Sequence, residues 1–260
     1  MNYKYGNKNN WRRWYWNKIR ERVNNPRDAI VLYLAGEADL DRDVALAKGF
    51  KNKNLIAVEN RRSVLAALRA KCVLTIDSDL CDVITDWPLD KPVQVVVGDF
   101  CGGLTLSRLK KLKHCWLRPQ FHDAVFCFNF LRGRDSTSNE IRKVYSEGAR
   151  KMGLGCQKHR AEAFMAFLAR GIAYLCEKAA PIDKHYTWDE LTNFSLYCLD
   201  KSKPEFRSYR STAGNQIFDS VVFKSPFKEI PIMSSVSDVA KGSTVRRRIA
   251  ATMAHRTMRL

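Results

Sequence analysis

The segment from Ala29 to Asp99 decides the fold, and it contains four short apolar runs: AIVLYLAGEAD (29–39), LIAVEN (55–60), VLTIDSD (73–79) and VQVVVGD (93–99). Each run is rich in branched aliphatic residues and ends at an acidic residue or at a glycine followed by an acid. Such runs predict strands that are buried on both faces of a sheet. The segments between the first three are long enough for helices, so a β-α-β-α-β order with a parallel sheet is expected.

The loop that follows the first run, Ala35 to Asp39, holds a single glycine and two acids. Gly36 allows a ligand to approach the backbone closely. A dinucleotide-binding loop has the pattern G-x-G-x-x-G and binds a pyrophosphate, which Glu37 and Asp39 would repel. The same two carboxylates would attract an ammonium group or ribose hydroxyls. The loop therefore favours a cationic, phosphate-free cofactor such as S-adenosylmethionine over NAD.

The ends of the following strands also carry acids at the edge where ligands bind in parallel sheets. Glu59 ends the second run, at a spacing from Gly36 typical of an acid that accepts hydrogen bonds from ribose hydroxyls. Asp79 follows the third run and could accept from an adenine amino group. Asp99 ends the fourth run, and we expect it to orient the group that is modified.

The second half of the chain predicts the remaining strands of the sheet. Residues 124–131 form a fifth apolar run, which leads into Arg132-Gly133-Arg134. These two arginines could bind a phosphate or a substrate carboxylate. Alternatively, they are surface residues that form ion pairs with Asp135. Residues 206–211 and 217–223 alternate in polarity around a turn at 212–215, as a β-hairpin does.

The order of these features resembles the class I (Rossmann-like) S-adenosylmethionine-dependent methyltransferases over about residues 29–135. Leu34–Asp39 resembles motif I with one glycine, Ala57–Asn60 motif II, Asp79–Leu80 motif III and Asp99–Phe100 the start of motif IV. The resemblance implies S-adenosylmethionine as cofactor, with contacts from Ala35, Gly36, Glu37, Asp39, Glu59, Asn60, Asp79, Leu80, Asp99 and Phe100. It also implies a closing antiparallel strand, which the hairpin would supply.

Motif IV departs from the patterns that name an acceptor atom. Asp99-Phe100-Cys101-Gly102 is neither the Asn/Asp-Pro-Pro-aromatic motif of amino-methylating DNA enzymes nor the Pro-Cys pair of cytosine-C5 enzymes. Asp99 is therefore the expected catalytic residue, with Asn129 and Arg132 as second choices, and the acceptor atom is left open.

The net charge of +18 is concentrated at the two ends of the chain, which supply two thirds of it. Cationic ends favour a polyanionic partner, most simply nucleic acid. The expected contacts are Arg12, Arg13 and Lys18 near the N-terminus, Arg134 at the sheet edge, and Arg246, Arg247 and Arg248 in a basic C-terminal helix. The alternative for the first segment is an amphipathic helix, because Trp11, Tyr15 and Ile19 share one face and would pack on the body.

Composition bounds the remaining possibilities. The eight cysteines form no C-x-x-C pair, so reduced thiols in a cytoplasmic protein without a metal site are expected. No apolar run is long enough for a transmembrane helix, so no membrane partner is expected. The predicted organisation is a basic aromatic arm (1–28), a doubly wound, mostly parallel seven-stranded α/β domain with an antiparallel C-terminal hairpin (29–225), and a linker with a basic helix (226–260).

Three functions fit these patterns. The first is an S-adenosylmethionine-dependent methyltransferase acting on DNA or RNA. The second is a non-catalytic nucleic-acid-binding or assembly protein on a methyltransferase-like scaffold. The third is an enzyme that binds a small anionic substrate through Arg132 and Arg134, although this leaves both cationic ends unexplained.

Overall fold

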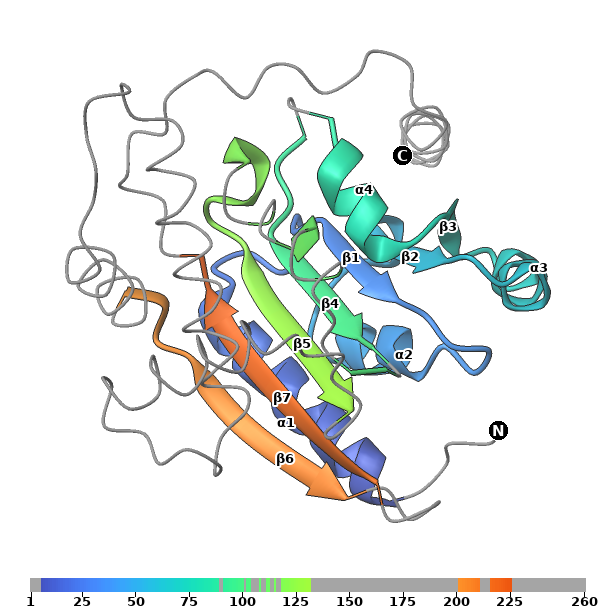
Figure 1. Ribbon diagram of the computed structural model, residues 1–260. Coiled ribbons are helices and arrows are strands. Elements are labelled where there is room, and N and C mark those ends of the chain that lie inside the picture. Colours follow the sequence, from blue (N-terminus) through green and yellow to red (C-terminus); the bar gives the residue numbers. More distant parts are fainter. Residues whose placement is uncertain are drawn as a thin grey trace, which may run out of the picture.

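A seven-stranded sheet forms the centre of the protein in a computed structural model (Figure 1). The structure describes residues 6–88, 91–100, 102–103, 108, 111–112, 115, 118–131, 201–210 and 216–225. The strand order is β3-β2-β1-β4-β5-β7-β6. The strands are β1 (Val31–Leu34), β2 (Leu55–Glu59), β3 (Leu74–Asp77), β4 (Val95–Asp99), β5 (Val125–Leu131), β6 (Glu205–Arg210) and β7 (Ile217–Lys224).

The pairing of the strands confirms the expected fold. Strands β1 to β5 are mutually parallel where they pair, and β7 lies antiparallel between β5 and β6. This is the doubly wound order of a Rossmann-like sheet, extended by an antiparallel hairpin. All five parallel strands are largely apolar and buried, because helices cover both faces of the sheet.

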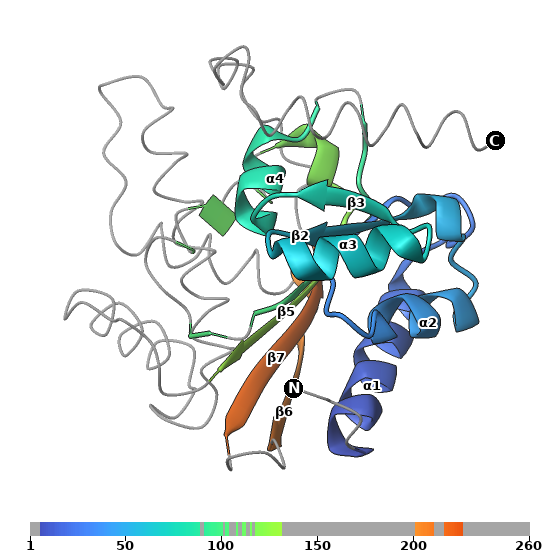
Figure 2. The same ribbon diagram turned by 90° about the vertical axis from the view of Figure 1, so that its right-hand side faces the viewer.

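The helices divide between the two faces. The core on one face contains side chains of α1 (Gly6–Arg22), α2 (Leu40–Ala47) and α3 (Arg62–Ala70). The core on the other face contains side chains of α4 (Leu80–Asp86). Figure 2 shows α1, α2 and α3 on the side of the sheet opposite α4. Short 3-10 turns, η1 (Asn52–Asn54) and η2 (Pro119–Phe121), precede β2 and β5.

Helix α1 is a layer of the fold rather than a projecting arm. Trp11, Tyr15 and Ile19 are each at most 1% exposed, which confirms the amphipathic alternative for this segment. Arg12 is only 4% exposed, so its predicted contact with nucleic acid is wrong: the guanidinium faces the protein interior. Arg13 is exposed, and Lys18 pairs with Glu21 and Glu205.

Gly98 lets β4 pass close to the neighbouring aromatic side chains. A Cβ at this position would lie 2.6 Å from Phe100 and 2.9 Å from Phe128, closer than real Cβ contacts. The glycine therefore permits the aromatic packing that fixes the end of β4, directly before Asp99. In the part of the chain that the structure describes, no helix has the length and apolar character needed to cross a membrane.

Candidate functional site

The carboxyl ends of β1, β2, β3, β4 and β5 bring the predicted acids to one edge of the sheet. Glu59 lies beside Asp77 in the pairing of β2 with β3, and Asp99 lies beside Asn129 in the pairing of β4 with β5. The loop after β1 leaves the sheet next to Glu59, because the Ala35 amide donates to the Val58 carbonyl at 3.4 Å. These residues, which lie far apart in the sequence, therefore border one region, which we call the carboxyl edge.

The loop after β1 combines open space with an unsatisfied carboxylate. Gly36 is exposed, and a Cβ placed on it would meet nothing within 4 Å. Asp39 has a left-handed backbone with φ of 49°, and its Oδ1 accepts a hydrogen bond from the Tyr33 hydroxyl at 2.9 Å. Its Oδ2 is buried, and no described residue donates a hydrogen bond to it. Burial raises the pKa of Asp39 to about 6, although the bond from Tyr33 opposes this shift.

Glu59 is held by the residues that follow it. Its carboxylate accepts bonds from the Asn60 and Arg61 amides at 3.0 and 2.9 Å, and from the Arg61 guanidinium at 3.1 and 2.9 Å. Burial by itself would raise the pKa of Glu59, but the bonds from Arg61 outweigh it, so the pKa lies below its ordinary value. Among the described residues, Oε2 accepts one hydrogen bond, from the end of the Arg61 side chain, which is 62% exposed. This oxygen could accept from a ligand hydroxyl.

Asp99 sits between a cation and an amide at the end of β4. Its Oδ2 forms an ion pair with Lys8 Nζ at 2.8 Å, and its Oδ1 accepts from Asn129 Nδ2 at 2.6 Å. The Asp99 side chain is 12% exposed and that of Lys8 is 15% exposed, so both reach the surface of the carboxyl edge. Lys8 comes from the first turns of α1, which the sequence alone did not connect with this site.

Asn129 is entirely buried in β5, beneath Asp99. Its Oδ1 accepts from the Ser220 hydroxyl at 2.8 Å, while its Nδ2 is bonded to Asp99. Ser220 in turn accepts from the Trp11 indole at 2.6 Å. The side chain of Asn129 has no exposed surface, and it connects to the surface of the carboxyl edge through its bond to Asp99. Its direct catalytic role stays a prediction.

A second buried cluster lies beside the first, under α1. Asp41 on α2 accepts from the Trp16 indole at 3.0 Å and pairs with Arg12 Nε at 3.2 Å. Burial raises the pKa of Asp41 to about 6, and the neighbouring Arg12 opposes this rise. The carboxylate of Asp41 explains why a guanidinium is tolerated beneath the helix.

The remaining predicted contacts divide between the edge and the core. Asp79 is the N-cap of α4, and its carboxylate accepts from the Cys81 amide at 2.8 Å. Glu37 and Asn60 are exposed at the edge. Leu80 and Phe100 belong to the core on the opposite face from Asp99, and their cofactor contacts stay predictions. Arg132, Arg134, Arg246, Arg247 and Arg248 lie outside the described residues, as does the segment 226–260.

Sequence reasoning missed Lys8, Asp41 and Ser220. Lys8 and Trp11 are three positions apart and thus share a helix face with Tyr15, which was the available signal for Lys8. Asp41 and Ser220 have no such signal, because their partners lie 25 and 209 positions away along the chain.

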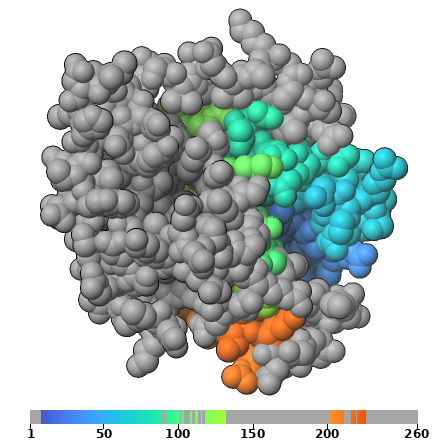
Figure 3. All heavy atoms as spheres, viewed as in Figure 1, coloured from blue at the N-terminus to red at the C-terminus, as the bar shows by residue number. Residues whose placement is uncertain are grey.

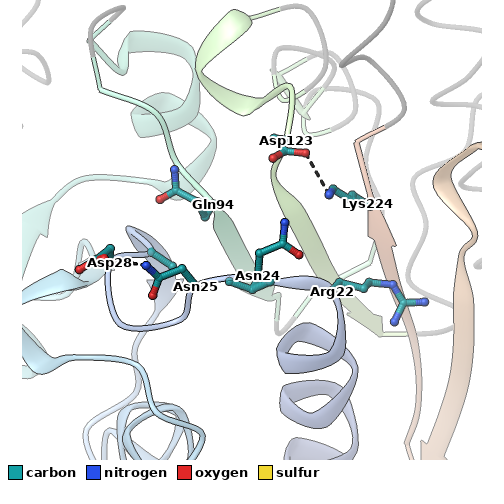
Figure 4. Close-up of a pocket in the computed structure, with 9 residues that line it drawn as sticks. Arg22, Asn24, Asn25, Asp28, Gln94, Asp123 and Lys224 are labelled. Atoms are coloured by element: carbon teal, nitrogen blue, oxygen red, sulfur yellow. Dashed lines mark hydrogen bonds and ion pairs between the residues drawn. The ribbon is translucent and has the colours of Figure 1, made fainter.

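A cavity of about 270 Å³ lies at the opposite edge of the sheet, between the end of α1 and the starts of β4 and β5 (Figure 4). Four of its charged and polar groups bond to one another: Lys224 pairs with Asp123 at 2.9 Å, and Asn25 donates to Asp28 at 2.7 Å. It contains none of the predicted site residues. Among the described residues, no group of histidine, cysteine and acidic side chains could hold a metal ion.

Comparisons with known proteins find similar structures but no similar sequences. No family model matches the chain, and no curated protein matches it. A SAM-dependent methyltransferase from Archaeoglobus fulgidus is 13% identical, with a TM-score of 0.41, over 82% of this chain and 94% of that chain. The plantazolicin methyltransferase BpumL, solved with a triazolic desmethylPZN analog and SAH, is 9% identical, with a TM-score of 0.44, over 85% and 86%.

A third similar structure is a probable spermidine synthase from Corynebacterium glutamicum ATCC 13032. It is 12% identical, with a TM-score of 0.43, over 93% of this chain and 70% of that chain. At such identities and TM-scores, these matches identify neither the activity nor the substrate of this chain.

Proposed function

We propose that the protein is an S-adenosylmethionine-dependent methyltransferase that acts on nucleic acid. The observation that carries the proposal is the buried, unpartnered Oδ2 of Asp39, in the loop whose Gly36 faces open space. A buried carboxylate oxygen without a donor is unfavourable, and the ammonium group of an amino-acid ligand would satisfy it. A phosphate at this place would instead be repelled.

The residues of the carboxyl edge fit the parts of this cofactor. Asp39 would hold its ammonium group, Oε2 of Glu59 would accept from its ribose, and the carboxylate of Asp79 would accept from its adenine amino group. When bound, S-adenosylmethionine supplies a methyl group on a sulfonium. Gly36 lets the backbone approach the ligand without obstruction by a side chain.

Asp99 and Lys8 suit the acceptor side of such a reaction. Methyl transfer is an in-line displacement, which an enzyme accelerates mainly by holding the acceptor in the correct direction. The Asp99 carboxylate reaches the surface and can accept a hydrogen bond from an acceptor group, while Lys8 fixes its other side. Asp99 is therefore the residue that we expect to orient the acceptor.

Exposed cations support a polyanionic acceptor. Arg61, Arg62, Arg69 and Lys71 are exposed at or beside α3, which follows the strand that ends at Glu59. The cyan region of Figure 3, which includes α3, forms an open surface of the described part of the molecule. Arg13 adds an exposed cation on α1. Cations beside the cofactor region would attract a phosphate backbone.

Isothermal titration with S-adenosylhomocysteine tests the cofactor assignment. We expect binding to the wild type and at least about tenfold weaker binding to Glu59→Ala, because hydrogen bonds to a charged group are lost. Asp123→Ala, an acid at the opposite edge of the sheet, is the matched control and should bind normally. Absence of binding to the wild type, or equal affinity in Glu59→Ala, would contradict the assignment.

One observation favours the non-catalytic alternative. Glu59 and Asp99 are each bonded to a cation of the protein itself, Arg61 and Lys8. A labelled-methyl transfer assay over pools of RNA, DNA and protein separates the two functions. Transfer to RNA or DNA supports the methyltransferase, whereas strongly salt-dependent nucleic-acid binding without transfer supports a binding protein.

A further inference from the structure

A continuous chain of hydrogen bonds links helix α1 to the carboxylate of Asp99. It begins at the Trp11 indole, passes through the Ser220 hydroxyl on β7 and the Asn129 amide on β5, and ends at Asp99 Oδ1. The three donor–acceptor distances are 2.6, 2.8 and 2.6 Å. Trp11 is fixed at its start by ring stacking on Tyr209, with centroids 4.8 Å apart.

The chemistry of these groups gives the chain one direction. An indole N–H can only donate, so it occupies an acceptor position of Ser220 and turns the hydroxyl hydrogen toward Asn129. Asn129 must then present its oxygen to Ser220. Its NH₂ group consequently faces Asp99, which as a carboxylate can only accept.

We propose that Ser220 is a positioning residue for Asp99, an assignment that rests on the proposed function. Ser220 fixes which way the Asn129 amide points, and the amide fixes one oxygen of Asp99. Lys8, from the same helix as Trp11, fixes the other oxygen. Helix α1 thus holds Asp99 from both sides, once directly and once through the interior of the sheet.

The setting argues for a positioning role rather than simple packing. Ser220 is fully buried, and its neighbours on β7, Val221 and Val222, are apolar and at most 1% exposed. An apolar residue at position 220 would pack equally well if the Asn129 amide were replaced at the same time, because no polar group would then be left without a partner. Packing alone therefore does not require a hydroxyl here. Ser225, directly after the same strand, is buried too, but its hydroxyl has no hydrogen-bond partner in the part of the chain that the structure describes. It is therefore the matched control.

The first test is independent of catalysis. Protein labelled with ¹⁵N in asparagine side chains is compared by NMR for the wild type, Ser220→Ala and Ser225→Ala, with Asn129→Asp to identify the Asn129 signals. We expect two well-separated, slowly exchanging NH₂ signals for Asn129 in the wild type and in Ser225→Ala. In Ser220→Ala they should move together and exchange faster. Unchanged Asn129 signals in Ser220→Ala would overturn the proposal.

The second test uses labelled-methyl transfer to the nucleic-acid pool that the wild type modifies. We expect Ser220→Ala to lower kcat about tenfold, because Asp99 is less well oriented, while the affinity for S-adenosylhomocysteine changes less than about twofold. Ser220→Thr keeps the hydroxyl and should recover most of the rate. Equal losses in Ser220→Ala and Ser220→Thr, or a loss that follows the unfolded fraction, would contradict a positioning role.

The two tests separate the proposal from the proposed function. If the wild type neither binds S-adenosylhomocysteine nor transfers a methyl group, the function fails, but the NMR comparison still decides whether Ser220 orients Asn129. If Ser220→Ala folds poorly, Ser220→Cys fills the site with a slightly larger side chain that is a much weaker donor, and it should show the same changes. Wild-type Asn129 signals in a folded Ser220→Cys protein would count against the proposal.

Discussion

Asp39 and Asp99 stand at the same edge of the sheet, but the protein holds their carboxylates in opposite ways. Asp39 lies in an exposed loop, has a left-handed backbone, and leaves one buried oxygen without a partner. Asp99 ends a strand, and donors from α1 and β5 contact both of its oxygens. One carboxylate oxygen in the loop after β1 therefore lacks a hydrogen-bond donor, whereas both carboxylate oxygens at the end of β4 are bonded within the protein.

This difference separates binding a ligand from orienting one. An unsatisfied, desolvated carboxylate lowers the stability of the fold, and a cationic ligand can relieve it. A carboxylate that is held on both sides keeps one direction without a ligand, as a group that must aim a reacting atom should. We therefore assign the β1–β2 half of the edge to the cofactor and the β4–β5 half to the acceptor.

The largest expected effect comes from a substitution that impairs only the acceptor half of the carboxyl edge. Asp99→Asn should lower the rate of methyl transfer about 1000-fold, because the amide cannot replace the charge and acceptor capacity of the carboxylate. The affinity for S-adenosylhomocysteine should change less than about twofold. The assay is labelled-methyl transfer combined with calorimetric titration. Lys224→Met, at the opposite edge, is the control, and a parallel loss of cofactor affinity in Asp99→Asn would show that the two halves are not separate.

Stability measurements sharpen the contrast between buried carboxylates. Asp41→Asn should lower the free energy of unfolding by about 3 kcal/mol, since the buried Arg12 loses its counter-charge. Asp39→Asn should instead raise it by about 2 kcal/mol at pH 7.5, because burial raises the pKa of Asp39 from 3.8 to about 6. The folded state binds this proton more tightly than the unfolded chain, so stability falls as the pH rises from about 4 to 6.

Urea denaturation at pH 4 and pH 7.5 measures the free energy of unfolding and so checks the predicted loss in Asp41→Asn and the predicted gain in Asp39→Asn. The gain in Asp39→Asn should disappear near pH 4, where Asp39 of the folded wild type is protonated. Destabilisation by Asp39→Asn at pH 7.5 would mean that Asp39 is not the costly group that we infer.

The smallest expected effect is a pH dependence of cofactor binding. Asp39 is ionised only above a pKa of about 6, so the affinity for S-adenosylhomocysteine should fall about tenfold from pH 7 to pH 5. Calorimetric titration across this range measures the effect. Asp39→Asn should bind weakly at every pH, with no such slope. A wild-type slope that persists unchanged in Asp39→Asn would assign the titration to another group.

Much of the sheet could be predicted because its signals are local. The runs that end at Glu59 and Asp99 are short, apolar and bounded by polar residues, and the structure ends β2 and β4 at those residues. The alternation of polar and apolar residues around a turn predicted the hairpin of β6 and β7. The acids gathered at one edge because parallel strands align their carboxyl ends.

Which face of the sheet a side chain occupies is one feature that the motifs did not predict, because neighbours in a strand point to opposite faces. Asp99 and Phe100 thus lie next to each other in the chain and on different sides of the sheet. Arg12 was expected at the surface with the other cations of its segment, but its position on the helix turns it toward Asp41.

The strands and the acids that end them follow from the sequence alone, because they depend on composition over a few residues. The packing of α1 against the sheet, which directs Lys8 at Asp99 and Trp11 at Ser220, follows from the three-dimensional arrangement of the elements. Contacts between residues 91 and 209 positions apart depend on how the strands pair and which face a helix covers. No local pattern carries that information, since each partner alone is an ordinary polar residue in an apolar element.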